Sequence, residues 1–275
     1  MANLTDAPLG KSSLYVDQYD PSLLFPVPRD SNRATLNIVS RELPFQGVDI
    51  WNAWEISWLN SKGKPMVAIG EITIPAASPF LIESKSFKLY LNSYNQTRFN
   101  SLEQVRTTMI KDLSEAAKAD VEVKLSLLSD SSGLEHIHAI PGSCIDDLDV
   151  AIDRYTTDAG LLQIESDRIV SETLCSHLMK SNCPVTGQPD WGSVIIKYTG
   201  KKISAESLLK YIVSFRQHTE FHEHCVERIF MDLLQLLQPT ELQVSARYVR
   251  RGGLDINPFR SLHAERPDNC RLLRQ

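Results

Sequence analysis

Long hydrophobic runs are absent from the 275-residue chain, although 42% of its residues are hydrophobic. No segment approaches the roughly 20 consecutive apolar residues that a membrane-spanning helix requires. The first residues, MANLTDAPLGKSSLYVDQYDP, show neither the basic start nor the apolar stretch of a secretory signal. We therefore expect a soluble globular protein of the cytoplasm, with packed cores and no membrane partner.

A regular cysteine framework is missing as well. The five cysteines form no CxxC pair, and their odd number suits a reducing compartment in which thiols stay free. Core or surface positions explain four of them adequately: Cys144, Cys175, Cys225 and Cys270. An excess of positive charge is also lacking, since the formal net charge is -5. Because phosphate binding needs a concentrated positive field, we expect a small-molecule substrate and no direct contact with nucleic acid.

Two familiar ligand motifs do not occur. No GxGxxG follows a predicted strand, so a dinucleotide would have to bind without a Rossmann site. No HExxH occurs either, although EFHEHCVERIF gathers several possible metal ligands. On a helix His222 and Cys225 would share one face, whereas His224 would point about 200° away from His222. Zinc is therefore only weakly indicated, and a polar helix start explains the pattern equally well.

The chain contains the same order of predicted strands and helices twice. The first half predicts an extended arm within 1–50, a hairpin over 54–76, two helices between 82 and 119, and a strand over 120–129. The second half predicts a strand over 193–200, helices over 204–218 and 220–238, and a closing strand over 241–253. Ser101, with Glu103 and Gln104 after it, predicts the cap of the second helix. The order of elements indicates two α+β modules, 1–150 and 151–275.

The segment SNCPVTGQPDWG, residues 181–192, is poor helix and poor strand, and we expect it to be a loop. Cys183 could act there as a nucleophile if Lys180 and nearby amides favour its thiolate; the alternative is a small buried hydrophobe. Asp190 precedes Trp191, whose ring could exclude water and raise the carboxyl pKa toward use in acid-base chemistry. The alternative for Asp190 is a turn or cap residue.

Three further groups could bind a ligand. Glu223, if it lines a pocket, could accept two parallel N–H donors from a guanine-type edge. In ESKSFKLY, residues 83–90, the lysines could equally belong to a solvated helix face. In RRGGLDINPFR, residues 250–260, the glycines would let the backbone approach a ligand while the arginines offer donors to phosphate. A turn with solvated arginines is the alternative for that segment.

Four segments together, in this order, resemble one enzyme family: ESKSFKLYLNSYNQTRFN, KSNCPVTGQPDWGS, FRQHTEFHEHCVERIF and RRGGLDINPFRS. The family is that of the NADPH-dependent nitrile reductases that convert 7-cyano-7-deazaguanine (preQ0) to 7-aminomethyl-7-deazaguanine in queuosine biosynthesis. The resemblance is to its long, two-module form and extends over nearly the whole chain, including GKSSLYVDQYDPSLLFPVPR and CIDDLDV. It implies tandem tunnelling-fold modules, each an antiparallel sheet with paired helices, and a homodimer that uses NADPH and no metal.

The resemblance also implies roles for individual residues. Cys183 would be the nucleophile that forms a covalent thioimide, and Asp190 would be the proton donor. The implied substrate-binding residues are Ile82, Glu83, Ser84, His222 and Glu223. The implied NADPH-binding residues are Ser84, Lys85, Arg251 and Gly252. The first module would carry ESKSFKLY and the N-terminal arm, and the second would carry the cysteine segment.

Two other functions stay open from the residues alone. Zinc-dependent cyclohydrolases share the implied fold and also hold a purine-like ring through a glutamate, but they need a more convincing set of Cys and His ligands than the spacing here supplies. A purine-binding module without catalysis is the third reading. The pairing of Cys183 with Asp190 argues against it, because simple binding would not require a thiol beside an acid.

Overall fold

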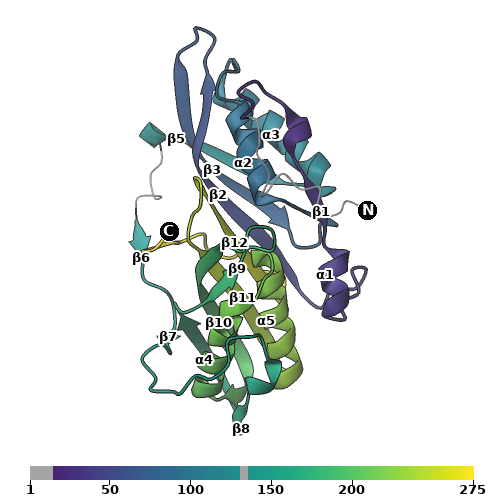
Figure 1. The fold of residues 1–275 in the computed structure, drawn as a ribbon, viewed down its shortest axis with the longest axis vertical. Helices are drawn as coiled ribbons and strands as arrows, with labels where there is room; N and C mark the ends of the chain where they lie inside the picture. Colours follow the sequence, from purple (N-terminus) through teal and green to yellow (C-terminus); the bar gives the residue numbers. More distant parts are fainter. Residues whose placement is uncertain (1–14, 131–135) are drawn as a thin grey trace. The chain divides into compact units, whose positions relative to one another are not determined.

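The computed structural model describes residues 15–130 and 136–275, which form two compact units (Figure 1). The first unit takes Met1–Arg41, Asp49–His136 and Arg250–Asp255; the second takes Glu42–Val48, Ile137–Val249 and Ile256–Gln275. Two strands, β2 (Gln46–Leu59) and β12 (Leu254–Ser261), contribute residues to both units. Each unit combines strands with two main helices, as the α+β prediction requires.

The first unit contains, in chain order and besides most of β2, η2 (Pro21–Leu23), β1 (Pro26–Pro28), α1 (Asp30–Thr35), β3 (Pro65–Pro75), β4 (Phe80–Ile82), α2 (Ser84–Ser93), α3 (Leu102–Ala117), β5 (Glu122–Leu127) and η3 (Leu128–Asp130). Its main sheet has the order β5-β3-β2, and β1 pairs with β4 apart from it. Helices α2 and α3 lie against this sheet (Figure 1).

Side-chain hydrogen bonds fix the turn between β2 and β3. Asn60 Oδ1 accepts from the backbone N–H groups of Lys62 and Lys64, each at 3.0 Å. Gly63 has φ +83°, a conformation that favours glycine. The turn of the long β2–β3 hairpin is thus determined by residues that are close together in the sequence.

Helix α3 follows directly from its sequence pattern. Ser101 Oγ accepts from Gln104 N–H at 3.1 Å, and Gln104 Oε1 accepts from the backbone N–H of Asn100. Side chains spaced four residues apart, Val105, Met109 and Leu113, are fully buried. The cap confirms the predicted start of this helix, and the apolar stripe forms its buried face.

The second unit contains, besides the remainder of β2 and β12, β6 (Ile137–His138), β7 (Ser143–Cys144), η4 (Ala159–Leu161), β8 (Ile164–Ser176), β9 (Lys180–Asn182), β10 (Pro189–Ile203), α4 (Ala205–Ser214), η5 (Phe215–Gln217), α5 (His222–Leu237), β11 (Glu241–Tyr248) and β13 (Arg271–Leu272). The main sheet has the order β12-β11-β10-β8-β7, and β9 pairs with β10. Helices α4 and α5 lie against it (Figure 1).

A buried ion pair ties α5 to the sheet of the second unit. Arg260 on β12 donates to Glu227 Oε1 on α5 through both Nε and Nη2, at 3.1 and 2.8 Å. Both side chains are fully buried. The Arg260 guanidinium also lies 5.4 Å from the centre of the Phe45 ring, within range of a cation–π contact. Desolvation of the two charges is offset by these fixed partners.

Most predicted elements are confirmed, and two expectations are wrong. The arm expected within 1–50 is not extended throughout, because helix α1 (Asp30–Thr35) lies in it. The hairpin over 54–76, the strand over 120–129 and the helices over 204–218 and 220–238 all form. Residues 181–192, however, are not a loop throughout. The antiparallel pairing of β9 with β10 takes up both ends of this segment. This pairing joins residues 7 to 11 positions apart, and Asn182 also forms backbone hydrogen bonds with His218 and Glu220. Together these bonds outweigh the local preference of the Pro and Gly residues.

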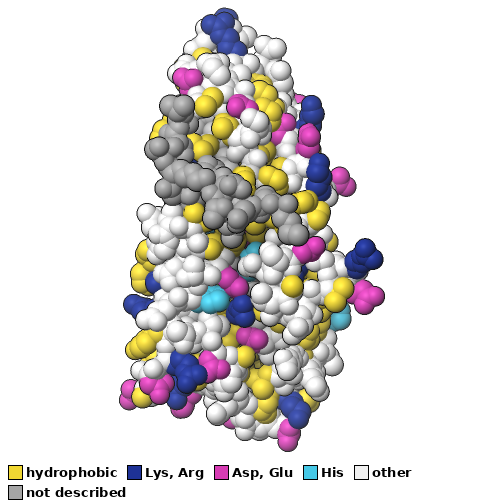
Figure 2. Space-filling view, turned by 45° about the vertical axis from the view of Figure 1, so that its right-hand side comes forward, with side chains coloured by type: hydrophobic (Ala, Val, Ile, Leu, Met, Phe, Trp, Pro, Cys, Tyr) yellow, Lys and Arg dark blue, Asp and Glu magenta, His cyan; other side chains and the backbone are white. Residues whose placement is uncertain are grey.

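No helix in the described part of the chain combines the length and the apolar character needed to span a membrane. On the face seen in Figure 2, acidic and basic side chains are interspersed and form no continuous positive patch. This mixed distribution agrees with the formal net charge of -5.

Candidate active site

Cys183 lies at the turn of the β9–β10 hairpin. Its backbone N–H donates to Gln188 O at 2.9 Å, and its carbonyl accepts from Gly187 N–H at 3.0 Å. Gly187 has φ +67°, which closes the turn without steric strain. The Cys183 side chain is 7% exposed. The thiol is thus held on a short hydrogen-bonded turn and is nearly shielded from water.

Asp190 lies on strand β10, where it pairs with Ser181 of β9. A strand is stiffer than a loop, so the position of its carboxyl group is fixed by the sheet. The Asp190 side chain is 5% exposed. The expectation that the ring of Trp191 shields Asp190 is wrong, because successive strand residues point to opposite faces. Trp191 is 41% exposed, and the Arg216 guanidinium lies 5.7 Å from its ring centre.

The start of α5 is held against the same hairpin. Asn182 N–H donates to His218 O at 2.8 Å, and Glu220 N–H donates to Asn182 O at 3.2 Å. Asn182 directly precedes Cys183 and pairs with Pro189, next to Asp190. The first residue of α5, His222, is therefore brought close to Asp190, with 3.4 Å between its Nε2 and Asp190 Oδ2.

The ring of Tyr248 packs against the ring of His222. The two rings are stacked, with 3.7 Å between their centres and 3° between their planes. Tyr248 is fully buried, and burial raises the pKa of its phenol well above the ordinary value. His222 Nδ1 is buried and has no hydrogen-bond partner among residues 15–130 and 136–275. No sequence pattern pointed to Tyr248, which lies on β11 outside every segment that carried the resemblance.

Glu223 follows His222 in the first turn of α5 and is 2% exposed. A carboxylate at this end of a helix is favoured by the unpaired backbone N–H groups there. Lys180, which could have favoured the Cys183 thiolate, donates instead to Asn182 Oδ1 and Arg216 O, at 2.6 and 2.7 Å. Burial lowers the pKa of its ammonium group.

A cluster of possible metal ligands lies beside this hairpin. The ligand atoms of His218, Glu220 and Cys225 are all within 4.8 Å of one another. Glu220 already accepts from His218 Nε2 at 2.7 Å and from Arg228 Nη2 at 2.8 Å. Although burial opposes its ionisation, these two partners lower the pKa of Glu220 to about 2. Burial raises the pKa of the Cys225 thiol. A cation would have to displace Arg228 and ionise this thiol, so the donor set fits a metal poorly.

The remaining predicted substrate residues lie in the first unit, at the junction of β4 and α2. Glu83 is fully buried and caps α2, since its two carboxylate oxygens accept from Lys85 N–H and Ser86 N–H, each at 2.8 Å. Burial raises the pKa of Glu83, and these two N–H donors act in the opposite direction. Ile82 is 1% exposed, whereas Ser84 and Lys85, in the first turn of α2, are half-buried.

The predicted NADPH residues Arg251 and Gly252 lie in a tight turn of the first unit. Arg251 N–H donates to Leu254 O at 2.8 Å, and the two central residues, Gly252 and Gly253, have φ of 58° and 80°. Two positive φ values are typical of the turn that joins hairpin strands. A Cβ atom on Gly252 would lie 3.2 Å from Cδ and Cε of Lys88, so glycine leaves room for that side chain.

The predicted residues therefore form two clusters, one in each unit. In the second unit the structure brings together Cys183, Asp190, His222 and Glu223. In the first unit the four consecutive residues Ile82–Lys85 begin α2, and the Arg251–Gly252 turn lies against Lys88 one turn further along that helix. Sequence reasoning missed the hydrogen-bonded pair His218 and Glu220.

Comparisons with known proteins identify the class of enzyme. Residues 15–125 match the family model described as "Nitrile reductase, 7-cyano-7-deazaguanine-reductase N-term", and residues 189–267 match the one described as "QueF-like protein". The two matches confirm tandem modules of the α+β tunnelling fold and define a two-domain nitrile reductase.

Curated relatives narrow the class to one family. The chain is 55% identical over 273 residues to the NADPH-dependent 7-cyano-7-deazaguanine reductase of Chromohalobacter salexigens, with 99% of this chain and 98% of the relative covered. It is 56% identical to the enzyme of that name from Chromobacterium violaceum, over 98% and 96% of the two chains. The chain belongs to the NADPH-dependent 7-cyano-7-deazaguanine reductase family. A solved archaeosine synthase QueF-Like, in the apo form, is 17% identical with a TM-score of 0.31 over 37% of this chain.

Proposed function

We propose that the chain reduces the nitrile of 7-cyano-7-deazaguanine to 7-aminomethyl-7-deazaguanine with NADPH, in queuosine biosynthesis, through a thioimide on Cys183. The cluster of Cys183, Asp190 and His222 carries this proposal. A nearly buried thiol lies on a hydrogen-bonded turn, and the same hairpin carries a buried carboxyl group with a histidine nitrogen 3.4 Å away. This arrangement supplies a nucleophile together with groups that can deliver and accept protons.

Covalent capture is the first step. The sulfur of Cys183 bonds to the nitrile carbon, and the nitrile nitrogen takes a proton from Asp190. The proton of the thiol passes to the Asp190–His222 pair, so the charges balance. A nitrile accepts hydride poorly, whereas a protonated thioimide has an electrophilic carbon. The burial of Cys183 and Asp190 also excludes water, which would otherwise hydrolyse the thioimide.

Two reductions complete the reaction. NADPH, when bound, supplies one hydride to the thioimide carbon and, from a second molecule, one to the imine carbon. Asp190 and His222 deliver the protons that the nitrogen gains at each stage. Between the two reductions the C–S bond breaks and Cys183 recovers its thiol. The sum is one nitrile, two NADPH and two protons converted to one primary amine and two NADP+.

Substrate recognition rests on Glu223 and on the start of α2. We assign Glu223 to the guanine-type edge, because one carboxylate can accept two parallel N–H donors. Its burial makes each of these bonds stronger than it would be in water. The contacts proposed for Ile82, Glu83 and Ser84 follow from the resemblance. Since the Ile82 side chain is 1% exposed, we expect it to contact the substrate through its backbone.

The cofactor residues fit NADPH. The Gly252–Gly253 turn has no side chains to obstruct a ligand, and Arg251 precedes it with a guanidinium suited to phosphate. Ser84 and Lys85 lie in the first turn of α2, where backbone N–H groups favour anions. We assign these four residues to the phosphates of NADPH. The homodimer is likewise a proposal from the resemblance, and sedimentation of the purified protein tests it.

The direct test is to weigh the intact protein after incubation with 7-cyano-7-deazaguanine alone. We expect the mass to increase by one molecule of substrate, and the Cys183→Ala variant to show no increase. Addition of NADPH should then restore the original mass with loss of absorbance from the nicotinamide. A wild-type protein that turns over without any trapped adduct, at any quench time, would refute the covalent route.

The cluster of His218, Glu220 and Cys225 gives the zinc-dependent alternative a specific test. Metal analysis of active protein and assay after treatment with a strong chelator separate the two chemistries. We expect full nitrile reduction after chelation. Stoichiometric zinc whose removal abolishes turnover and whose return restores it would support the cyclohydrolase-like reading instead.

A further inference from the structure

A network of buried side-chain hydrogen bonds surrounds the end of strand β11 in the second unit. Its centre is the amide of Gln275, a residue that is 5% exposed. The amide Oε1 accepts from Arg247 Nε at 3.0 Å and from the backbone N–H of Leu272 at 3.1 Å. The amide Nε2 donates to Tyr248 O at 3.2 Å and to Asn257 Oδ1 at 2.8 Å. Because donors face one end of the amide and acceptors face the other, the network fixes its orientation.

The backbone ladder between β11 and β12 stops before it reaches Tyr248. Its last pair is Ser245 with Phe259. The residue of β12 that would continue the ladder is Pro258, which has no N–H to donate. Buried backbone N–H and C=O groups beyond this point need other partners, because leaving them unpaired costs free energy.

Asn257 and Gln275 supply these partners for Tyr248. Val249 N–H donates to Trp191 O on β10 at 2.8 Å. Since backbone groups alternate between the two sides of a strand, those of Tyr248 point away from β10. On that side its N–H donates to Asn257 Oδ1 at 3.3 Å, and its C=O accepts from Gln275 Nε2. Two buried amides thus hold the backbone of Tyr248 in place of a neighbouring strand.

The ring of Tyr248 links this network to His222. Gly192 lies opposite Tyr248 on β10, and a Cβ atom there would be 3.1 Å from Tyr248 Cδ1, so the ring lies directly against β10. The same ring is stacked on His222, with 3.7 Å between the ring centres. His222 Nδ1 has no hydrogen-bond partner in the described part of the chain. The stack and the contact with Asp190 therefore set the plane of the imidazole.

We propose that Gln275 is a positioning residue for proton transfer, because it fixes Tyr248, whose ring holds the His222 imidazole beside Asp190. The inference rests on the proposed function, in which Asp190 and His222 deliver the protons. The distance from His222 Nε2 to Asp190 Oδ2 is 3.4 Å, so a small shift of the stack separates the two groups. A misplacement of about 1 Å in an active site can cost roughly 10²-fold in rate.

The first measurement is the rate of covalent capture at saturating 7-cyano-7-deazaguanine, followed by intact mass after rapid quenching. In Gln275→Ala we expect the rate constant to fall about 10-fold, with the same final captured fraction as the wild type. Gln275→Glu keeps the shape and the acceptor oxygen but removes both donors, so it should slow capture as well. Partial unfolding would instead lower the captured fraction. Gln235→Ala, which removes the same amide from the exposed surface of α5, is the matched control.

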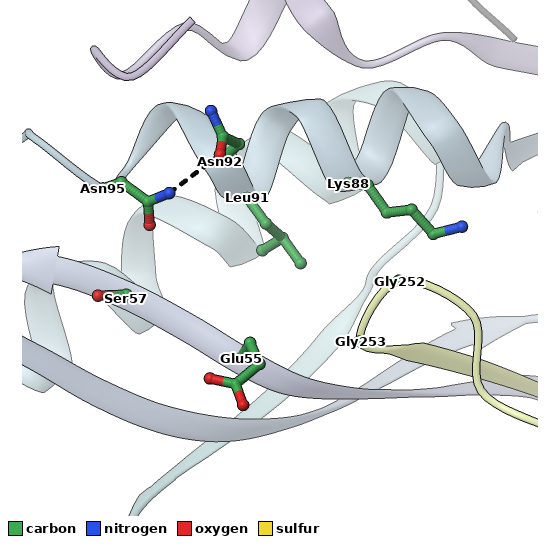
Figure 3. A pocket seen from close by; sticks show the side chains of 8 residues that line it. All are labelled: Glu55, Ser57, Lys88, Leu91, Asn92, Asn95, Gly252 and Gly253. Atoms are coloured by element: carbon green, nitrogen blue, oxygen red, sulfur yellow. Dashed lines mark hydrogen bonds between the residues drawn. The ribbon is translucent and has the colours of Figure 1, made fainter. Parts of the chain in front are cut away.

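The KM for NADPH separates this effect from a general loss of structure. The turn assigned to NADPH and the groove beside it belong to the first unit (Figure 3). Changes at Gln275 should therefore lower kcat and leave the KM for NADPH within about twofold of the wild type. A KM that rises as much as kcat falls would contradict the proposal.

A double-mutant cycle tests whether Gln275 acts through the ring of Tyr248. Tyr248→Leu removes the stack and should slow capture, and adding Gln275→Ala should then change the rate less than about twofold. Tyr248→Phe keeps the ring and should restore most of the rate, and in that background Gln275→Ala should again cost about 10-fold. An equal loss in both backgrounds would show that Gln275 acts without the ring, and would overturn the proposal.

NMR of the His222 ring protons gives a readout without turnover. A stacked aromatic ring shifts these protons upfield, and their loss in His222→Asn identifies them. We expect the shift in the wild type and in Tyr248→Phe, a smaller one in Gln275→Ala, and none in Tyr248→Leu. Slow capture by Gln275→Ala with an unchanged His222 shift would overturn the proposal.

Gly192→Ala moves the same ring from the side of β10 without changing Gln275, so it carries the test if the Gln275 variants do not fold. It should slow capture and reduce the His222 shift together. Capture within about twofold of the wild type in every folded variant of Gln275 and Gly192 would overturn the positioning role. A wild-type protein that captures no substrate would instead refute the proposed function.

Discussion

Replacing Asp190 by Asn separates proton delivery from structure. Asparagine has nearly the same shape, and the backbone pairing of Asp190 with Ser181 in the β9–β10 hairpin does not depend on the side chain. What the substitution removes is the ionisable oxygen that lies 3.4 Å from His222 Nε2. The fold and the position of the Cys183 thiol should therefore stay the same, while the acidic group is lost.

The expected loss in the rate of covalent capture follows from the proposed role of Asp190 as a general acid. A positioned general acid contributes roughly 10²–10⁴-fold, which is about 3–5 kcal/mol of barrier at 1.36 kcal/mol for each factor of ten. We expect the rate of covalent capture, followed by intact mass after rapid quenching, to fall by that factor in Asp190→Asn. Trp191→Phe, on the opposite face of the same strand, is the control and should capture at the wild-type rate. Capture by Asp190→Asn within about threefold of wild type would refute the assignment.

Three further predictions concern binding and stability. Glu223→Ala should weaken substrate binding by about 2–4 kcal/mol, because two buried charge-assisted bonds are lost, and should change NADPH binding much less; equal losses in calorimetry would place the base elsewhere. Since the folded-state pKa of Glu220 is lowered to about 2 from 4.5, its ionised form stabilises the fold above about pH 4.5. The difference in unfolding free energy between wild type and Glu220→Gln should shrink as the pH falls from about 5 toward 2, and a constant difference would contradict this. Glu227→Ala should cost about 3–5 kcal/mol in urea unfolding, because it leaves the buried guanidinium of Arg260 without its carboxylate; a loss below about 1 kcal/mol would show that water reaches the pair.

Much of the fold can be predicted from short-range sequence patterns. The hairpin over 54–76 and the cap at Ser101 each depend on residues that are close in sequence, and each is confirmed. Such signals are reliable because a cap or an apolar face is satisfied by the element itself and one neighbour.

The β9–β10 hairpin was mistaken for a loop because Pro and Gly residues dominate its local pattern, and some of the bonds that hold it come from outside the hairpin. Pro189 begins β10, and Asn182 bonds to the backbone of His218 and Glu220, more than 30 positions away in the chain. Tyr248 was missed for the same reason, since only the fold stacks it on His222. The roles of Cys183 and Asp190 came from the resemblance, and their spacing alone favoured a buried thiol and a turn residue.

The most direct measurement of the central claim is the steady-state rate of NADPH oxidation by Cys183→Ala in the presence of 7-cyano-7-deazaguanine. We expect no detectable oxidation, with substrate still bound and a melting temperature near that of the wild type, because alanine removes only the sulfur from the turn. Oxidation at a rate close to that of the wild type would contradict it.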